Sequence, residues 1–159
     1  AAMVTKSNHP VISNIPIVTM SVHSISGKTV NEIKQDTTSN VRGWVLSHEF
    51  RASYRDSLTS SETIKSGVFT PEAQSNKTIP ISVSENFADN AKVTIGDNIT
   101  FNVQGILMDT QVGSIRIVDW SQMQVNFNVC FICSSAFNRY HRYFSFTSLT
   151  CSRKRKLKN

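Results

Sequence analysis

Cysteine is absent from the first 129 residues, and acidic residues are absent from the last forty. The three cysteines are Cys130, Cys133 and Cys151, and the last acidic residue is Asp119. A disulfide-stapled fold is therefore excluded for residues 1–129. The absence of cysteine there is compatible with an oxidising compartment and equally with the cytoplasm.

Long apolar runs are also missing. The longest is VCFIC at 129–133, whereas a membrane helix needs about 20 apolar residues. The sequence also lacks the charged start and following apolar stretch of a secretory signal, so no such signal is predicted. With 39% hydrophobic and 18% charged residues, the composition predicts a soluble, polar-leaning globular domain.

The charge that is present is unevenly distributed. The formal net charge is +6, but residues 1–119 carry ten basic and eleven acidic residues, a net charge of −1. The other seven basic residues all follow Asp119. The high isoelectric point therefore belongs to the last forty residues, and so sharp a break predicts a boundary between a body and a basic tail.

The tail, which ends in TCSRKRKLKN, has three readings. The segment RYHRYFSF at 139–146 interleaves basic and aromatic residues, as single-strand nucleic-acid platforms do. A cluster of Lys and Arg could also lie next to a membrane. The third reading is a solvated stretch that the fold of the body does not constrain.

The hydrophobic pattern predicts an α+β, strand-dominated fold with a mostly antiparallel sheet and one or two short helices. Alternation of apolar and polar residues is clearest at 98–105. Ser84 is a suitable N-cap for a short helix over 85–92. Residues 57–66, rich in Ser, Thr and Glu, are predicted to be a loop. The other expected strands are 15–25, 40–56 (one strand or a bent pair, with a bend at Gly43), 79–83, 106–118 and 123–132, and 30–35 could form one or two helical turns.

No set of residues predicts catalysis. SGKT at 26–29 resembles the end of a phosphate-binding loop, but Val22 stands where that loop needs glycine. His48, Glu49 and Asp56 could form an acid–base group. Adjacent strand residues point to opposite faces, however, so His48 and Glu49 are not expected to share a pocket. We therefore predict that the chain is not an enzyme.

A zinc site is the weaker reading of the cysteine-containing segment. The possible ligands are Cys130, Cys133, His141 and Cys151, and the first spacing suits zinc. Phe131 and Ile132 fill the intervening turn, however, and the alternation continues a strand. Buried or incidental thiols are favoured, and no cofactor is expected.

Two stretches carry a family resemblance. They are RGWVLSHEFRASYRDSLTSSETIKSG at 42–67 and NVQGILMDTQVGSIRIVDWSQMQVNF at 102–127. Over roughly 15–127 the chain resembles the large extracytoplasmic domain of FtsX-like (MacB-like) ABC transporter permeases, in the bacterial group linked to lysophospholipase export. The motif residues with an expected structural or interface role are Trp44, Arg51, Tyr54, Arg55, Asp56, Gly96, Asp97, Gly105, Gly113, Arg116, Asp119, Trp120 and Asn126.

The resemblance implies a non-catalytic role in transport. Such a domain would lie on the periplasmic side of the bacterial inner membrane, as part of a permease whose other segments form membrane helices. A separate cytoplasmic ATPase would drive it, and its motion would reach an unknown substrate or periplasmic partner. Partly buried Arg116 and Asp119, with Trp120, would form a packing or subunit contact, because buried charges need partners.

The resemblance stops after Phe127. The domains expected are an extended segment over 1–14, a partial permease-type domain over 15–129 and a divergent basic tail over 130–159. A reading-frame shift or truncation near 128–130 would explain the change in composition. The alternative function is a small basic nucleic-acid-binding protein that uses the tail. Nucleic acid is the less favoured partner.

Overall fold

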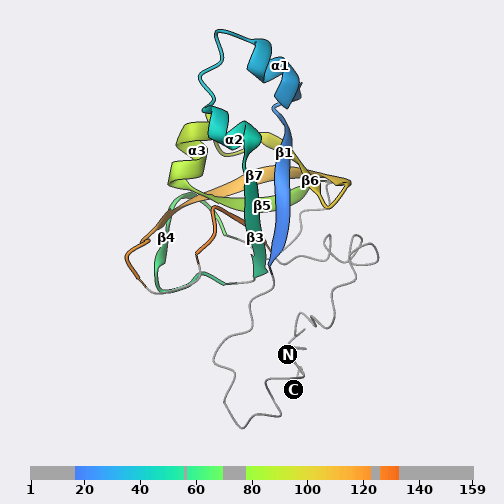
Figure 1. Ribbon diagram of the computed structural model, residues 1–159. Helices are drawn as coiled ribbons and strands as arrows, with labels where there is room; N and C mark the ends of the chain where they lie inside the picture. Colours follow the sequence, from blue (N-terminus) through green and yellow to red (C-terminus); the bar gives the residue numbers. More distant parts are fainter. Residues whose placement is uncertain (1–16, 56, 70–77, 123–125, 133–159) are drawn as a thin grey trace.

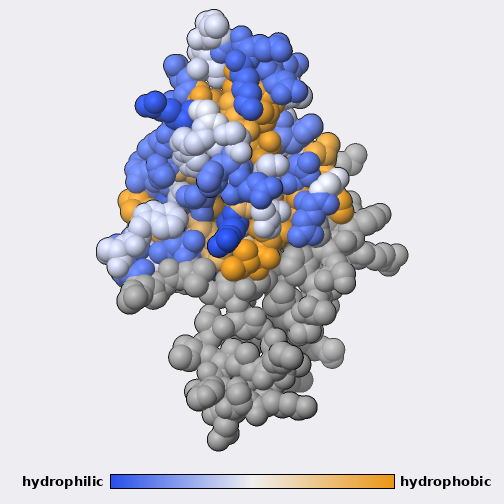
Figure 2. Space-filling model, in the orientation of Figure 1, coloured by the Kyte–Doolittle hydropathy of each residue, from blue (hydrophilic) through white to orange (hydrophobic). Residues whose placement is uncertain are grey.

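The computed structural model describes residues 17–55, 57–69, 78–122 and 126–132 (Figure 1). Strands dominate it, and about 50% of it is strand, so the α+β, strand-dominated class is confirmed. Among the described residues no helix is both long and apolar enough to cross a membrane. Hydrophilic residues cover most of the face drawn in Figure 2, and hydrophobic residues form smaller patches between them.

Six strands close into a barrel. β1 pairs with β3 on one side and with β6 on the other, so the sheet returns to its first strand. The order around the barrel is β1–β3–β8–β5–β7–β6. The bounds are β1 Val18–Ile25, β3 Glu49–Arg55, β5 Ile79–Ser84, β6 Asn98–Val103, β7 Ile106–Val118 and β8 Val129–Ile132.

The expected mostly antiparallel sheet is therefore corrected to a closed barrel of mixed direction. β3 pairs with β8, and β5 with β7, in parallel. The antiparallel hairpin β6–β7 joins neighbours in sequence, and its turn at Gln104 and Gly105 is visible in the sequence. β3 and β8 are separated by more than seventy residues. A local pattern cannot indicate such a pairing or its direction.

The barrel interior is apolar. Val18, Met20 and Val22 of β1 and Ile99, Phe101 and Val103 of the neighbouring β6 are all buried in it. Alternate residues of these strands point inward, as the period of two predicts.

Two short helices, α2 (Gly43–Ser47) and α3 (Glu85–Ala91), lie together at one end of the barrel (Figure 1). Phe87 of α3 meets Phe50 of β3 edge to face, with ring centroids 5.3 Å apart, so this end is closed by aromatic packing.

Two of the three helices begin at the residues that the sequence indicates. The Ser84 hydroxyl accepts a hydrogen bond from the Phe87 N–H, which confirms the predicted cap of α3. α1 (Val30–Gln35) follows the two-residue strand β2 (Lys28–Thr29), and Thr29 and Glu32 form a reciprocal capping box.

Two predictions about local structure are wrong. Residues 40–56 form helix α2 and then strand β3, and Gly43 begins the helix instead of bending a strand. Residues 57–66 include most of strand β4 (Glu62–Gly67), which pairs with β7 on the outside of the barrel. The alternation in β4 was hidden because its buried end carries a charged residue, Glu62.

Candidate functional site

A second buried layer lies on the outer face of the barrel, on strands β3, β8, β5 and β7. Residues that alternate with the interior ones point into it, and several are polar. Glu62, at the start of β4, and Phe127 contact two arginines of this layer. The buried residues on the outward-pointing positions of the four strands are Ser53, Cys130, Ile132, Ser82, Ser84, Ser114, Arg116 and Val118.

Arg116 is the centre of this layer and is 0% exposed. Its Nε lies 3.1 Å from Oε1 of Glu62, and its Nη1 donates to the Ser82 carbonyl oxygen at 2.6 Å. Its Nη2 donates to the Phe127 carbonyl oxygen and lies 3.2 Å from the Cys130 Sγ. A buried guanidinium is tolerated only when its charge and its N–H groups are matched, as they are here.

Glu62 is shared by two arginines. Its Oε1 also accepts from Arg55 Nη2 at 2.9 Å, and its Oε2 accepts from the Thr59 N–H at 3.3 Å. Arg55 lies over the Phe127 ring, 5.9 Å from the centroid. Contacts with Arg55 and Arg116 therefore fix the start of β4 to the barrel, mainly through charge and hydrogen bonds.

Cys130 belongs to this charged layer. Its Sγ lies 3.0 Å from Arg55 Nη2 and 3.2 Å from Arg116 Nη2. Two guanidinium groups around one sulfur disfavour a bound cation. No group of three metal-ligating side chains occurs in the part of the chain that the structure describes. The other possible zinc ligands, Cys133, His141 and Cys151, lie outside the described residues.

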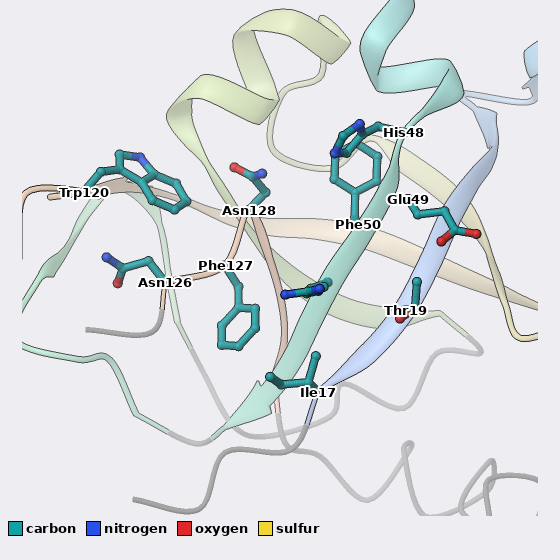
Figure 3. A pocket seen from close by; sticks show the side chains of 10 residues that line it. Ile17, Thr19, His48, Glu49, Phe50, Trp120, Asn126, Phe127 and Asn128 are labelled. Atoms are coloured by element: carbon teal, nitrogen blue, oxygen red, sulfur yellow. The ribbon is translucent and has the colours of Figure 1, made fainter. Parts of the chain in front are cut away.

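A groove of about 520 Å³ adjoins the buried layer (Figure 3). Phe127 connects the two, because it lines the groove and also contacts Arg55. Trp120 is 54% exposed there, and Ile17 at the opposite end is also exposed. The remaining lining residues are Thr19, His48, Glu49, Phe50, Arg51, Asn126 and Asn128.

His48 and Glu49 both line this groove, which corrects the expectation that they could not share a pocket. The expectation assumed that both lie in a strand. His48 instead ends helix α2, and Glu49 begins β3, so strand alternation does not apply across the pair. His48 packs against Trp44 and Phe50, with ring centroids 6.4 Å and 5.8 Å away.

Arg116, Asp119 and Trp120 do not form one packed unit. Arg116 is buried with its partners, whereas Asp119 and Trp120 are exposed. The Asp119 carboxylate accepts from the Ser121 hydroxyl at 2.6 Å and from the Gln122 amide at 3.0 Å. Hydrogen bonds from the Ser121 and Gln122 side chains and from the Ser121 N–H lower the pKa of Asp119 below its usual value.

The other predicted residues divide into four groups. Arg51 and Asn126 line the groove with Trp120, and Asn126 accepts from the Ser61 hydroxyl at 2.9 Å. Trp44 packs on Phe50 in the helical end of the barrel, at 5.8 Å between centroids. Gly96, Asp97, Gly105 and Gly113 are turn or backbone positions. The side chain of Tyr54 and the whole of Asp56 lie outside the described part of the structure.

The turn residues have clear structural roles. Gly96 and Gly105 have positive φ angles of 95° and 92°, which glycine adopts without strain. Asp97 Oδ2 accepts from the Thr94 N–H at 2.7 Å. Gly113 lies in β7 beside β5, where an added Cβ would make only ordinary van der Waals contacts with Ile81 and Pro80.

Sequence reasoning missed the role of Glu62. It was one acid in a segment that resembled a loop, and nothing local distinguished it. The one available signal was Arg116, which the strand pattern placed next to buried residues. A buried arginine needs an acidic partner, and Glu62 was one of the candidates.

No family model, curated protein or solved structure matches this chain. The resemblance to ABC transporter permeases therefore rests on the sequence motifs alone.

Proposed function

We propose that the chain is a non-catalytic extracytoplasmic domain of an ABC-type permease, on the periplasmic side of the bacterial inner membrane. It would bind a substrate or partner in its groove and pass on motion that a cytoplasmic ATPase drives. The remainder of the permease would supply the membrane helices. No catalytic step is assigned to it.

One observation carries the proposal. The two stretches that resemble the permease family lie far apart in sequence, yet Arg55 of the first and Arg116 of the second bind the same carboxylate, that of Glu62. The same stretches supply Arg51, Trp120 and Asn126 to the adjoining groove. The motifs thus meet at one place on the barrel, which supports a shared role for them.

The closed barrel suits the transmission of motion. Its strands are hydrogen-bonded around the full circle, and β4 is fixed to it through buried charges. Packed interiors deform little and transmit strain. A displacement at the groove would therefore move the barrel as a unit.

The first test is to sequence the coding DNA from the codon of Val125 onward and through the neighbouring genes. The proposal expects another frame that encodes long apolar helices, and a nearby gene for an ATPase with a phosphate-binding loop. An uninterrupted frame that stops after Asn159, with no ATPase gene nearby, would contradict it.

The second test uses the complete permease and its ATPase in lipid vesicles. Trp120→Ala in the groove should change the coupling of ATP hydrolysis to transport. Val68→Ala is the matched control, because Val68 is 65% exposed and lies outside the groove. Equal effects of the two substitutions would remove the groove from the proposal.

The nucleic-acid alternative depends on residues 139–158, which lie outside the described residues. Deletion should begin at 133, because β8 continues through Ile132. The shortened chain should lose salt-sensitive binding of mixed single strands if the tail carries that function. Unchanged binding would exclude the tail.

A further inference from the structure

Arg51 presents a cation to the groove without an ion pair among the described residues. It is exposed and lines the groove. The ion pairs in that part of the chain join Lys28 to Asp36, Lys65 to Glu85, and Arg55 and Arg116 to Glu62. Arg51 is thus the arginine of this region whose charge remains available to a ligand.

Asn128 adds a second donor to the same groove. Its Oδ1 accepts from the Ser84 hydroxyl at 3.0 Å, which leaves the Nδ2 amide hydrogens without a hydrogen-bond partner among the described residues. Figure 3 shows Asn128 between Trp120 and β3, above Phe127. A guanidinium and an amide NH₂ both donate, so together they favour a ligand group that only accepts.

The one carboxylate in the lining does not occupy this position. Glu49 lies on the other side of β3 from Asn128 and Phe127, and its carboxylate is directed away from them (Figure 3). The side of the groove next to Phe127 therefore combines free donors with aromatic surface.

Aromatic residues form the rest of that side. Trp120 is 54% exposed, and Phe127, which is 4% exposed, also lines the groove with its ring below Asn128 (Figure 3). Flat apolar groups pack well on such surfaces. The volume of about 520 Å³ lies within the range of about 300–1,000 Å³ that is typical of small-molecule sites.

We infer that the groove binds a small organic anion, with a carboxylate or phosphate head on Arg51 and Asn128 and a flat apolar body on the exposed ring of Trp120. A guanidinium can bind either head through two parallel hydrogen bonds. The inference deepens the proposed function, because it names the ligand class of the same groove.

The test compares three probes that share one apolar body: 3-phenylpropionate, 3-phenylpropyl phosphate and 3-phenylpropan-1-ol. Binding to the full chain is followed by calorimetric titration and by Trp120 fluorescence in a Trp44→Phe background. At least one anion should bind about tenfold or more tightly than the alcohol, a difference of about 1.4 kcal/mol. The two anions together show which head the groove prefers.

Arg51→Gln should weaken binding of the preferred anion about tenfold and leave binding of the alcohol unchanged. Arg42→Gln is the matched control, since Arg42 is also exposed but lies outside the groove. Circular dichroism checks that both variants fold. The inference is overturned if the alcohol binds as well as the anions, if no probe saturates, or if Arg51→Gln and Arg42→Gln have equal effects.

These results are separate from the test of the permease role. Anion binding without an ATPase gene nearby would leave the groove assignment intact and remove the proposed function. A permease gene context without anion binding would do the reverse.

Discussion

The inside and the outside of the barrel bury residues by different means. The interior is filled with apolar side chains such as Ile99 and Phe101, whereas the outer layer is held by Arg116, Glu62 and their partners. Apolar contacts in the interior have no directional requirement, so many combinations of apolar side chains would fill it. The outer layer needs specific donors opposite specific acceptors, and it fixes where β4 lies.

The largest effect is expected from breaking the outer layer. Arg116→Met would leave Glu62 with one arginine and would remove donors from two buried carbonyl oxygens. We expect the free energy of unfolding, measured with urea, to fall by about 3–5 kcal/mol. Arg51→Met is the control and should change it by less than about 0.5 kcal/mol, because Arg51 is exposed.

A double substitution sharpens this prediction. Glu62→Leu combined with Arg116→Met removes both charges of the most buried pair. It should cost less than Arg116→Met alone, because no fully buried carboxylate is left behind and Arg55, which loses its partner, is partly exposed. An equal or greater loss would mean that the shape of the layer matters more than its charges.

The next effect comes from the interior. Ile99→Ala removes a side chain that is 0% exposed and should lower the free energy of unfolding by about 2–5 kcal/mol. Ile99→Val should cost only about 0.5–1.5 kcal/mol. A loss in Ile99→Val as large as that in Arg116→Met would contradict the idea that the interior is the more tolerant region.

The end of β4 provides a smaller test of how closely it must approach β7. A Cβ at Gly67 would overlap the Gly113 carbonyl oxygen, whereas one at Gly96 meets nothing within 4 Å. Both glycines have positive φ angles, 80° and 95°. Gly96→Ala should lose about 1–2 kcal/mol from backbone strain alone, and Gly67→Ala should lose more. Thermal unfolding of the two variants makes the comparison.

The smallest effect concerns pH and the exposed Asp119. Its pKa is lowered in the folded chain, chiefly by the Ser121 side chain. The stability it contributes is therefore fully present above the ordinary Asp pKa of 3.8 and is lost as the pH falls through the lower folded value. Asp119→Asn should flatten that part of the stability profile, as followed by acid unfolding. An unchanged profile would show that these hydrogen bonds are not maintained in solution.

The interior was largely predictable from the sequence. Alternation at 98–105 and the Ser84 cap each depend on neighbours in the chain, and both are confirmed. The direction of β8 beside β3 was not predictable, because it depends on a pairing across more than seventy residues.

The candidate site was predictable only in part. The resemblance singled out Arg51, Trp120 and Asn126, and the structure brings these three to one groove. The contact of Glu62 with two arginines could not be read from spacing, because each arginine comes from a different strand. The exposure of Trp120 was also missed. The buried Val118 nearby suggested that Trp120 is buried too, but β7 ends at Val118 and Trp120 lies beyond it.

The position of β8 has a consequence for how the chain is made. β8 is the last strand along the described sequence, yet it sits between β3 and β5. As the ribosome extends the chain, both of those strands wait with an unpaired edge until residue 132 has emerged. Unpaired edges invite contacts with other chains, and such distant pairings form slowly. The period of greatest risk for this protein therefore falls during its synthesis, and slower translation over the last strand would prolong it.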